Sequence, residues 1–142
     1  MKRLTKSILV FAIIFSILLS VPAAAASAVE PRASKYFTSY SAKIVSKGGG
    51  NYALDFDVTG TKTLAKIGVT KIVLYKNGAA IDTIRYTDSD GSGLMAYNTY
   101  IHAHTLNLKG TSGSKYYAVL TFYGADSSGN DTKTYITTTV TI

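Results

Sequence analysis

The two histidines of the 142-residue chain lie at positions 102 and 104. Alternate residues of a β-strand point to the same side, so a strand here would present both imidazoles together, about 7 Å apart. Imidazole nitrogens bind zinc, copper and nickel, and this spacing allows His102 and His104 to chelate one ion. The same side of the strand carries Leu106 and Leu108. The histidines could therefore equally lie at the rim of a hydrophobic core, and the spacing shows no third ligand.

An Asp-rich segment, residues 88–93, holds a second set of candidate ligands. Asp88 and Asp90 bring together carboxylate oxygens of the kind that bind Ca²⁺, but the later bidentate Glu of a full calcium loop is missing. Residues 126–131 form another oxygen-rich loop. Asp, Ser and Gly are also the ordinary residues of turns, so two unliganded loops are the simpler interpretation.

Motifs of known catalytic chemistry are missing from the sequence. The chain has no Cys, which excludes a thiol nucleophile and a thiolate metal site. It also has no G-x-S-x-G, phosphate-loop or H-E-x-x-H motif. Asp55 and Asp57 share one side of a predicted strand, where a solvated outer face explains them better than an acid–base pair. We expect a protein that is not an enzyme and uses no cofactor.

The first 28 residues have the parts of a secretory signal peptide. A basic start at Lys2, Arg3 and Lys6 precedes an uncharged apolar run, residues 8–19, and small residues lead to a cleavage site after Ala28. Twelve apolar residues span only ~18 Å as a helix, against ~30 Å for a bilayer core. We expect the mature chain, residues 29–142, to be secreted and extracellular, without a membrane span.

Composition limits the class of protein further. The chain is 46% hydrophobic and only 16% charged, which excludes a disordered polypeptide. Three of its 15 Lys and Arg residues lie in the leader, so the mature chain carries 12 against 8 Asp and Glu, a formal charge of +4. So modest a charge, spread along the chain, does not indicate binding to nucleic acid.

Strand periodicity dominates the sequence after residue 35. The even-numbered residues of 52–58 are large and apolar, and Asn77-Gly78 separates two further apolar runs as a type I′ hairpin turn would. Other strands are predicted at 39–45, 100–108, 116–123 and 134–142, and one helical turn could occupy 63–68. About seven strands predict an all-β fold: an antiparallel immunoglobulin-like β-sandwich over residues 29–142, acting as a monomer.

Tyr116 lies two residues before the predicted core position Ala118 and follows a Gly-containing turn. In immunoglobulin-like domains a tyrosine at such a corner folds its hydroxyl back onto the preceding backbone. A simple core tyrosine is the alternative interpretation.

A tyrosine-rich outer face is the strongest candidate for binding. The predicted inward-facing residues of three strands are Ile72, Leu74, Ala118, Leu120 and Ile136. The residues between them would face outward and include Lys71, Val73, Tyr75, Tyr117, Val119, Tyr123 and Tyr135. Tyrosines with basic edges suit stacking on sugars or docking of a protein. Alternatively, Tyr is simply a good strand residue that its neighbours half cover.

Several short motifs lie between residues 33 and 142. They are Ala33-Ser34-Lys35-Tyr36, Phe56-Asp57-Val58-Thr59-Gly60-Thr61, Ile72-x-Leu74-Tyr75, Gly110-x-x-Gly113-x-x-Tyr116-Tyr117-Ala118 and Thr121-Phe122-Tyr123-x-Ala125-Asp126-Ser127-Ser128-Gly129. In these motifs the chain resembles an uncharacterised family, a domain of unknown function, of small secreted proteins of Gram-positive bacteria. The resemblance implies a secreted β-sandwich and no catalytic activity.

These observations predict an extracellular binding or interaction module. Its partner would be a protein or a glycan, such as a component of the cell envelope, met through the tyrosines or the Asp-rich loops. The alternative is a secreted cationic, bacteriocin-like antagonist that acts on competitor cells.

Overall fold

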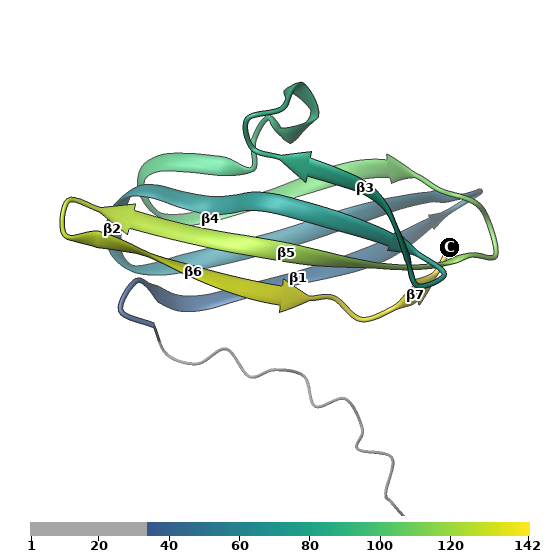
Figure 1. Ribbon diagram of the computed structural model, residues 1–142, viewed down its shortest axis with the longest axis horizontal. Helices are drawn as coiled ribbons and strands as arrows, with labels where there is room; N and C mark the ends of the chain where they lie inside the picture. Colours follow the sequence, from purple (N-terminus) through teal and green to yellow (C-terminus); the bar gives the residue numbers. More distant parts are fainter. Residues whose placement is uncertain (1–33) are drawn as a thin grey trace, which may run out of the picture. The chain divides into compact units, whose positions relative to one another are not determined.

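The computed structural model describes residues 34–142; the predicted leader and its cleavage site lie outside these residues. The described chain forms seven strands: β1 (Phe37–Gly48), β2 (Asn51–Lys76), β3 (Ala79–Arg85), β4 (Met95–Lys109), β5 (Lys115–Asp126), β6 (Gly129–Ile136) and β7 (Val140–Thr141) (Figure 1). A short 3-10 turn, Ser89–Gly91, lies between β3 and β4. Every strand pairing is antiparallel, which confirms the predicted all-β class and the number of strands. Within residues 34–142, no helix is long and apolar enough to cross a membrane.

The 26-residue strand β2 connects the two halves of the sheet. Its first half, residues 51–60, pairs with β1 on one side and with β4 on the other. Its second half, residues 66–76, pairs with β5 on one side and with β3 and the start of β4 on the other. The helical turn predicted at 63–68 is therefore wrong. Leu64 and Ile67 have helical spacing and are both buried, because β2 bends between the two halves here.

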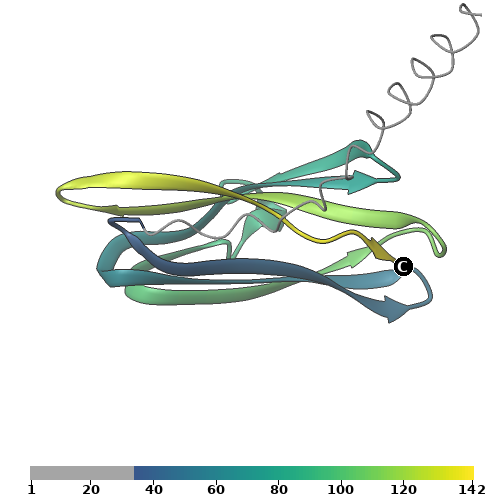
Figure 2. The same cartoon turned by 90° about the horizontal axis from the view of Figure 1, so that it is seen from below.

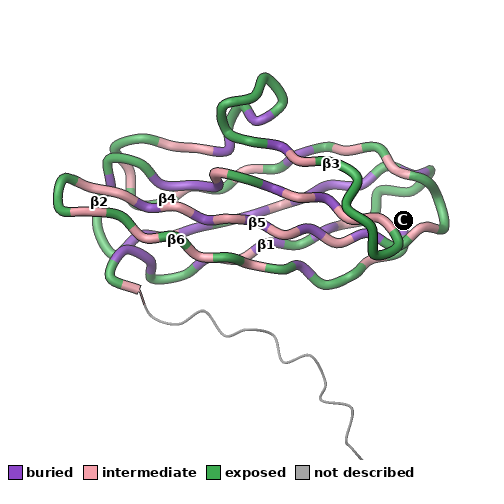
Figure 3. The backbone as a smooth tube through the Cα atoms, viewed as in Figure 1, coloured by how far each residue is buried: buried purple, intermediate pink, exposed green. Residues whose placement is uncertain are grey.

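The sheet curls so that β1 lies opposite β5 and β6 (Figure 2). The ring of Tyr40 on β1 lies 5.2 Å from Phe122 on β5 and 6.2 Å from Tyr135 on β6, measured between ring centroids. Many strands show buried residues in alternation (Figure 3), and the buried side chains form one hydrophobic core. The largest side chains that are fully buried there are Tyr52, Tyr116, Phe122, Leu54, Leu64, Ile67, Ile72, Leu94 and Leu120.

The predicted Asn77-Gly78 hairpin is confirmed. Asn77 and Gly78 have φ angles of 49° and 85°, the left-handed values that a type I′ turn requires at both positions. Lys76 pairs with Ala79 across the turn, and a one-residue shift follows, after which Leu74 pairs with Asp82. This shift leaves Ile81 as an extra residue on β3 and decides which residues of β3 face outward.

Candidate functional site

The predicted outer face lies across β3, the second half of β2, β5 and β6, and we call it the tyrosine face. Opposed residues of paired strands share a side, so the ladders place its side chains in three parallel rows. The first row contains Arg85, Lys71, Thr121 and Thr134; the second contains Thr83, Val73, Val119 and Ile136; the third contains Tyr75 and Tyr117. The face therefore changes from cationic and hydroxylated, through aliphatic, to aromatic along the direction of the strands.

Tyr75 and Tyr117 form the aromatic end of the tyrosine face. Their rings are stacked, with centroids 4.5 Å apart and planes 6° from parallel. Each ring therefore covers one face of the other. Both side chains are half-buried. Tyr123 lies on the same side of β5 but beyond the cationic row, opposite Thr132. Sequence analysis placed these three tyrosines on the correct side of the sheet.

Tyr135 was predicted to lie on the tyrosine face, but the structure places it on the inner side of the sheet. Its ring packs inward against Tyr40 and Phe122, and it pairs with the fully buried Leu120. Ile136, predicted to face the core, is instead 62% exposed and pairs with Val119 on the outer side. The predicted alternation treats residues 134–142 as one continuous strand, but residues 137–139 are not part of any strand. An irregular stretch of this kind shifts the alternation by one residue and exchanges the two sides.

Arg85, in the cationic row, was not among the predicted residues of this face. Lys71 lies directly opposite Arg85, and neither side chain forms an ion pair among the described residues. Like charges directly opposite each other destabilise a sheet slightly, so this pair is a feature that a bound partner could complement. The one-residue shift in the β2–β3 hairpin brings Arg85 to this side, and only the register of that hairpin could have shown it.

His102 and His104 do lie together, at the rim of the core on β4. Their ring centroids are 6.3 Å apart, and the ring of Phe56 packs against both, at 5.5 Å and 6.1 Å. Nε2 of His102 lies 2.7 Å from the carbonyl oxygen of Gly93. Burial, and then the proximity of His102, lower the pKa of His104 below its ordinary value, which favours its neutral form.

The Asp-rich segment 88–93 forms a turn around the 3-10 residues Ser89–Gly91. The carboxylate of Asp88 accepts a hydrogen bond of 3.0 Å from the backbone N–H of Arg85, and the exposed Asp90 lies in the 3-10 turn. Within residues 34–142, no three His, Asp or Glu side chains lie close enough to hold a metal together. The segment acts as an ordinary turn, in which Asp88 satisfies a backbone donor.

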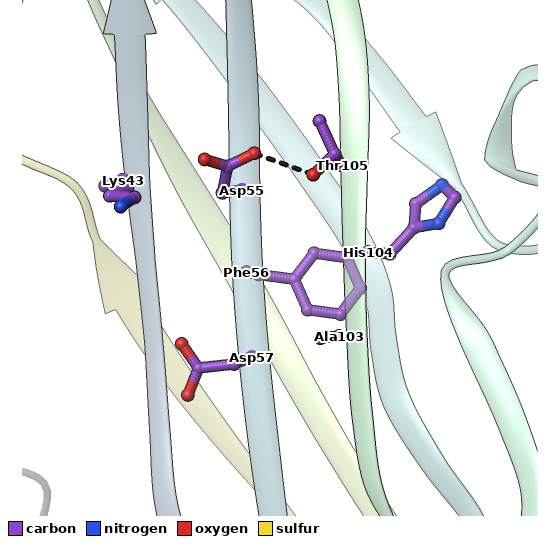
Figure 4. Close-up of a pocket in the computed structure, with 7 residues that line it drawn as sticks. All are labelled: Lys43, Asp55, Phe56, Asp57, Ala103, His104 and Thr105. Carbon is purple, nitrogen blue, oxygen red and sulfur yellow. Dashed lines mark hydrogen bonds between the residues drawn. The ribbon is translucent and has the colours of Figure 1, made fainter.

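A pocket of about 470 Å³ lies on the other half of the sheet (Figure 4). Its lining comprises Lys43, Asp55, Phe56, Asp57, Ala103, His104 and Thr105. Asp55 accepts a hydrogen bond of 2.8 Å from Thr105, and Asp57 accepts one from Ser41 at 2.5 Å. Both carboxylates are thus bonded to hydroxyl groups of neighbouring strands, as on a solvated strand face. In Figure 4 the ring of His104 projects away from both.

Scans against protein-family models, curated proteins and solved structures find no match to this chain.

Proposed function

We propose that the protein is a secreted, extracellular binding module that docks a partner protein through the tyrosine face. The aliphatic row carries this proposal, because Ile136 projects from it with 62% of its surface exposed beside Val119 and Val73. Exposed aliphatic side chains flanked by aromatic and charged residues are typical of protein interfaces. Secretion rests on the leader-like sequence of residues 1–28 and on the resemblance to small secreted proteins of Gram-positive bacteria.

We propose an immunoglobulin-like sandwich as the scaffold. In that fold strands C, F and G share one sheet, and strands A, B and E share the other. The second half of β2 pairs with β5, and β5 pairs with β6, which supports assigning these segments to C, F and G. The first half of β2 pairs with β1 and β4, as strand B pairs with A and E. The side chain of Tyr116, folded back onto the turn before β5, gives further support.

A protein suits the tyrosine face better than a glycan does. Stacking on a sugar ring needs an aromatic face that lies flat and free on the surface. Tyr75 and Tyr117 instead cover each other, with planes only 6° from parallel, and stand beside an aliphatic row. The partly exposed surface of a stacked tyrosine pair can pack on side chains, and its hydroxyl groups can donate hydrogen bonds, as tyrosines do at protein interfaces.

Activity as a cationic antagonist has less support. An antagonist that binds anionic membranes would concentrate its cations on one side. Here Lys71 lies on the tyrosine face, whereas Lys43 lines the pocket on the other half of the sheet. Killing of competitor cells that fades with added salt would favour this alternative, since salt screens attraction between exposed charges.

Sedimentation with cell-wall fragments, whole cells and mucin tests the proposal. We expect the mature chain to sediment saturably with whole cells or wall fragments that carry a partner protein, and to remain bound at high salt. Protease treatment of those cells should abolish the binding if the partner is a protein, whereas survival of the binding would point to a glycan.

A matched pair of variants assigns the surface. Ile136→Ser should weaken the binding, whereas Ile101→Ser should not, because Ile101 is similarly exposed, at 54%, but lies on β4 outside the tyrosine face. Equal binding by both variants and by the wild type would contradict the assignment of the face.

A further inference from the structure

We propose that His102 and His104 form a binding site for one divalent transition-metal ion, with Cu²⁺ the preferred ion. Both imidazoles project from the same side of β4, and their ring centroids are 6.3 Å apart with planes 16° from parallel. Metal–nitrogen bonds of ~2.0–2.1 Å hold two imidazoles on one ion with centroids within about 6 Å. A small rotation of the two side chains therefore brings both rings onto a shared ion.

His102 is already held in the orientation of a metal ligand. Its Nε2 lies 2.7 Å from the Gly93 carbonyl oxygen, and a carbonyl can only accept, so Nε2 carries the proton and donates it. The other nitrogen, Nδ1, then keeps its lone pair for a metal. Ligating histidines commonly donate their second N–H to a backbone carbonyl in this manner, which fixes the ring and raises its basicity.

The surroundings of the two rings favour binding over mere packing. Phe56 packs against both rings and shields them on one side, while both histidines remain partly exposed. The described residues offer no carboxylate as a third ligand, because Asp55 and Asp57 lie on the opposite side of the sheet. Water would complete the coordination. Two imidazoles without carboxylate or thiolate favour Cu²⁺ among the divalent ions, in keeping with its place in the order of metal affinities.

The segment before β4 would be held in place by the bound ion. A β-carbon at position 93 would lie 2.5 Å from Cε1 of His104, so the backbone of Gly93 rests directly on that ring. Gly93 thus lies against both histidines: its carbonyl oxygen bonds to His102, and its backbone approaches the ring of His104. An ion that fixes both rings would stabilise the link between residues 88–94 and β4.

The full chain, produced without a polyhistidine tag, permits a sharp test because it has no other histidines. Titration calorimetry with Cu²⁺ should give one ion per chain, and pulsed electron paramagnetic resonance should detect two equatorial imidazoles on that ion. His102→Gln and His104→Gln should each weaken Cu²⁺ binding at least about tenfold, since even partners outside the first coordination shell are worth 10–100-fold. Each variant should leave one imidazole in the spectrum.

Two results would overturn the proposal. One is the absence of a Cu²⁺ isotherm with wild-type protein whose circular dichroism shows it to be folded. The other is binding with equal affinity by the wild type and both single variants, which would mean that each histidine binds independently or that the ion lies elsewhere. Ca²⁺ serves as the negative control, since it prefers oxygen ligands.

Discussion

The phenolic oxygen of Tyr116 accepts a hydrogen bond from the backbone N–H of Thr111, with 2.8 Å between oxygen and nitrogen. The bond spans the turn between β4 and β5, and the Tyr116 ring lies so close to Gly110 that a β-carbon there would be 2.7 Å from Cζ. The folded-back hydroxyl, one of the two interpretations that the sequence left open, is the one observed. The same ring is also part of the core, where it packs at a tilt of 34° against Tyr52 with ring centroids 5.0 Å apart.

Tyr116→Phe should destabilise the protein by about 1–3 kcal/mol, because it leaves the N–H of Thr111 without its partner while the ring packing is kept. The free energy of unfolding in urea measures this change. Tyr52→Phe is the matched control: it removes a hydroxyl from the adjacent ring, which forms no hydrogen bond with a backbone N–H of residues 34–142, and should cost less. Equal losses in the two variants would contradict a structural role for the Tyr116 hydroxyl.

Tyr135→Ala should destabilise the protein by about 2 kcal/mol or more, because it removes a ring that packs against Tyr40 and Phe122. Its neighbour Ile136 gives the contrast: Ile136→Ser should change stability by no more than about 0.5 kcal/mol, since that side chain is mainly in solvent. Thermal unfolding of the two variants would check the orientation of β6. A larger loss from Ile136→Ser would show that the strand faces the other way.

Acid should destabilise the hairpin between β5 and β6. A hydrogen bond from Lys62, then hydrogen bonds from Ser128, hold the pKa of Asp126 well below its usual range. A lowered carboxyl pKa means that the folded state binds fewer protons than the unfolded state near pH 4. The stabilisation is therefore present above the ordinary value of 3.8 and is lost as the pH falls below it.

Urea unfolding between about pH 5 and about pH 2 would measure this loss. Lys62→Gln should reduce the dependence of stability on pH over that interval, because it removes the largest cause of the lowered pKa. Lys66→Gln, a change of the same charge at an exposed lysine with no ion pair among the described residues, should leave the dependence unchanged. Identical profiles for the two variants would mean that Lys62 does not set the pKa of Asp126.

Gly91→Ala should prevent the segment 88–94 from packing against the end of β3. Gly91 is buried, and a β-carbon there would overlap the carbonyl oxygen of Arg85. Because backbone atoms cannot move aside cheaply, we expect a loss of stability well above that of Gly113→Ala, where a β-carbon meets nothing within 4 Å. At position 113 the cost is only the left-handed φ of 81°, about 1 kcal/mol. Similar melting temperatures for the two variants would contradict the close approach.

Local signals in the sequence were sufficient for much of this fold. Asn77-Gly78 predicted its hairpin because few residues adopt positive φ at two successive positions. The alternation in residues 52–58 predicted a half-buried strand, and the inward residues Leu54, Phe56 and Val58 are all buried. Tyr75 and Tyr117 were placed on one face for the same reason.

Features that depend on one extra residue in a strand could not be predicted from the periodicity of the sequence. The shift at Ile81 brings Arg85, rather than Ile84, beside Lys71. Near the C-terminus, Thr137 leaves the β6 ladder and its hydroxyl accepts a hydrogen bond of 3.0 Å from the N–H of Ala118. A side chain that takes the place of a backbone acceptor leaves no periodic pattern in the sequence. The prediction therefore assigned Tyr135 and Ile136 to the wrong sides of the sheet.

The long strand β2 has a consequence for how the protein opens. It takes part in the ladders with β1, β3, β4 and β5, so release of β2 breaks four ladders and leaves only those of β5 with β6 and β7. The amide hydrogens of β2 should therefore exchange with solvent only when the whole domain unfolds, while those at the outer edge of β6 exchange through local fraying.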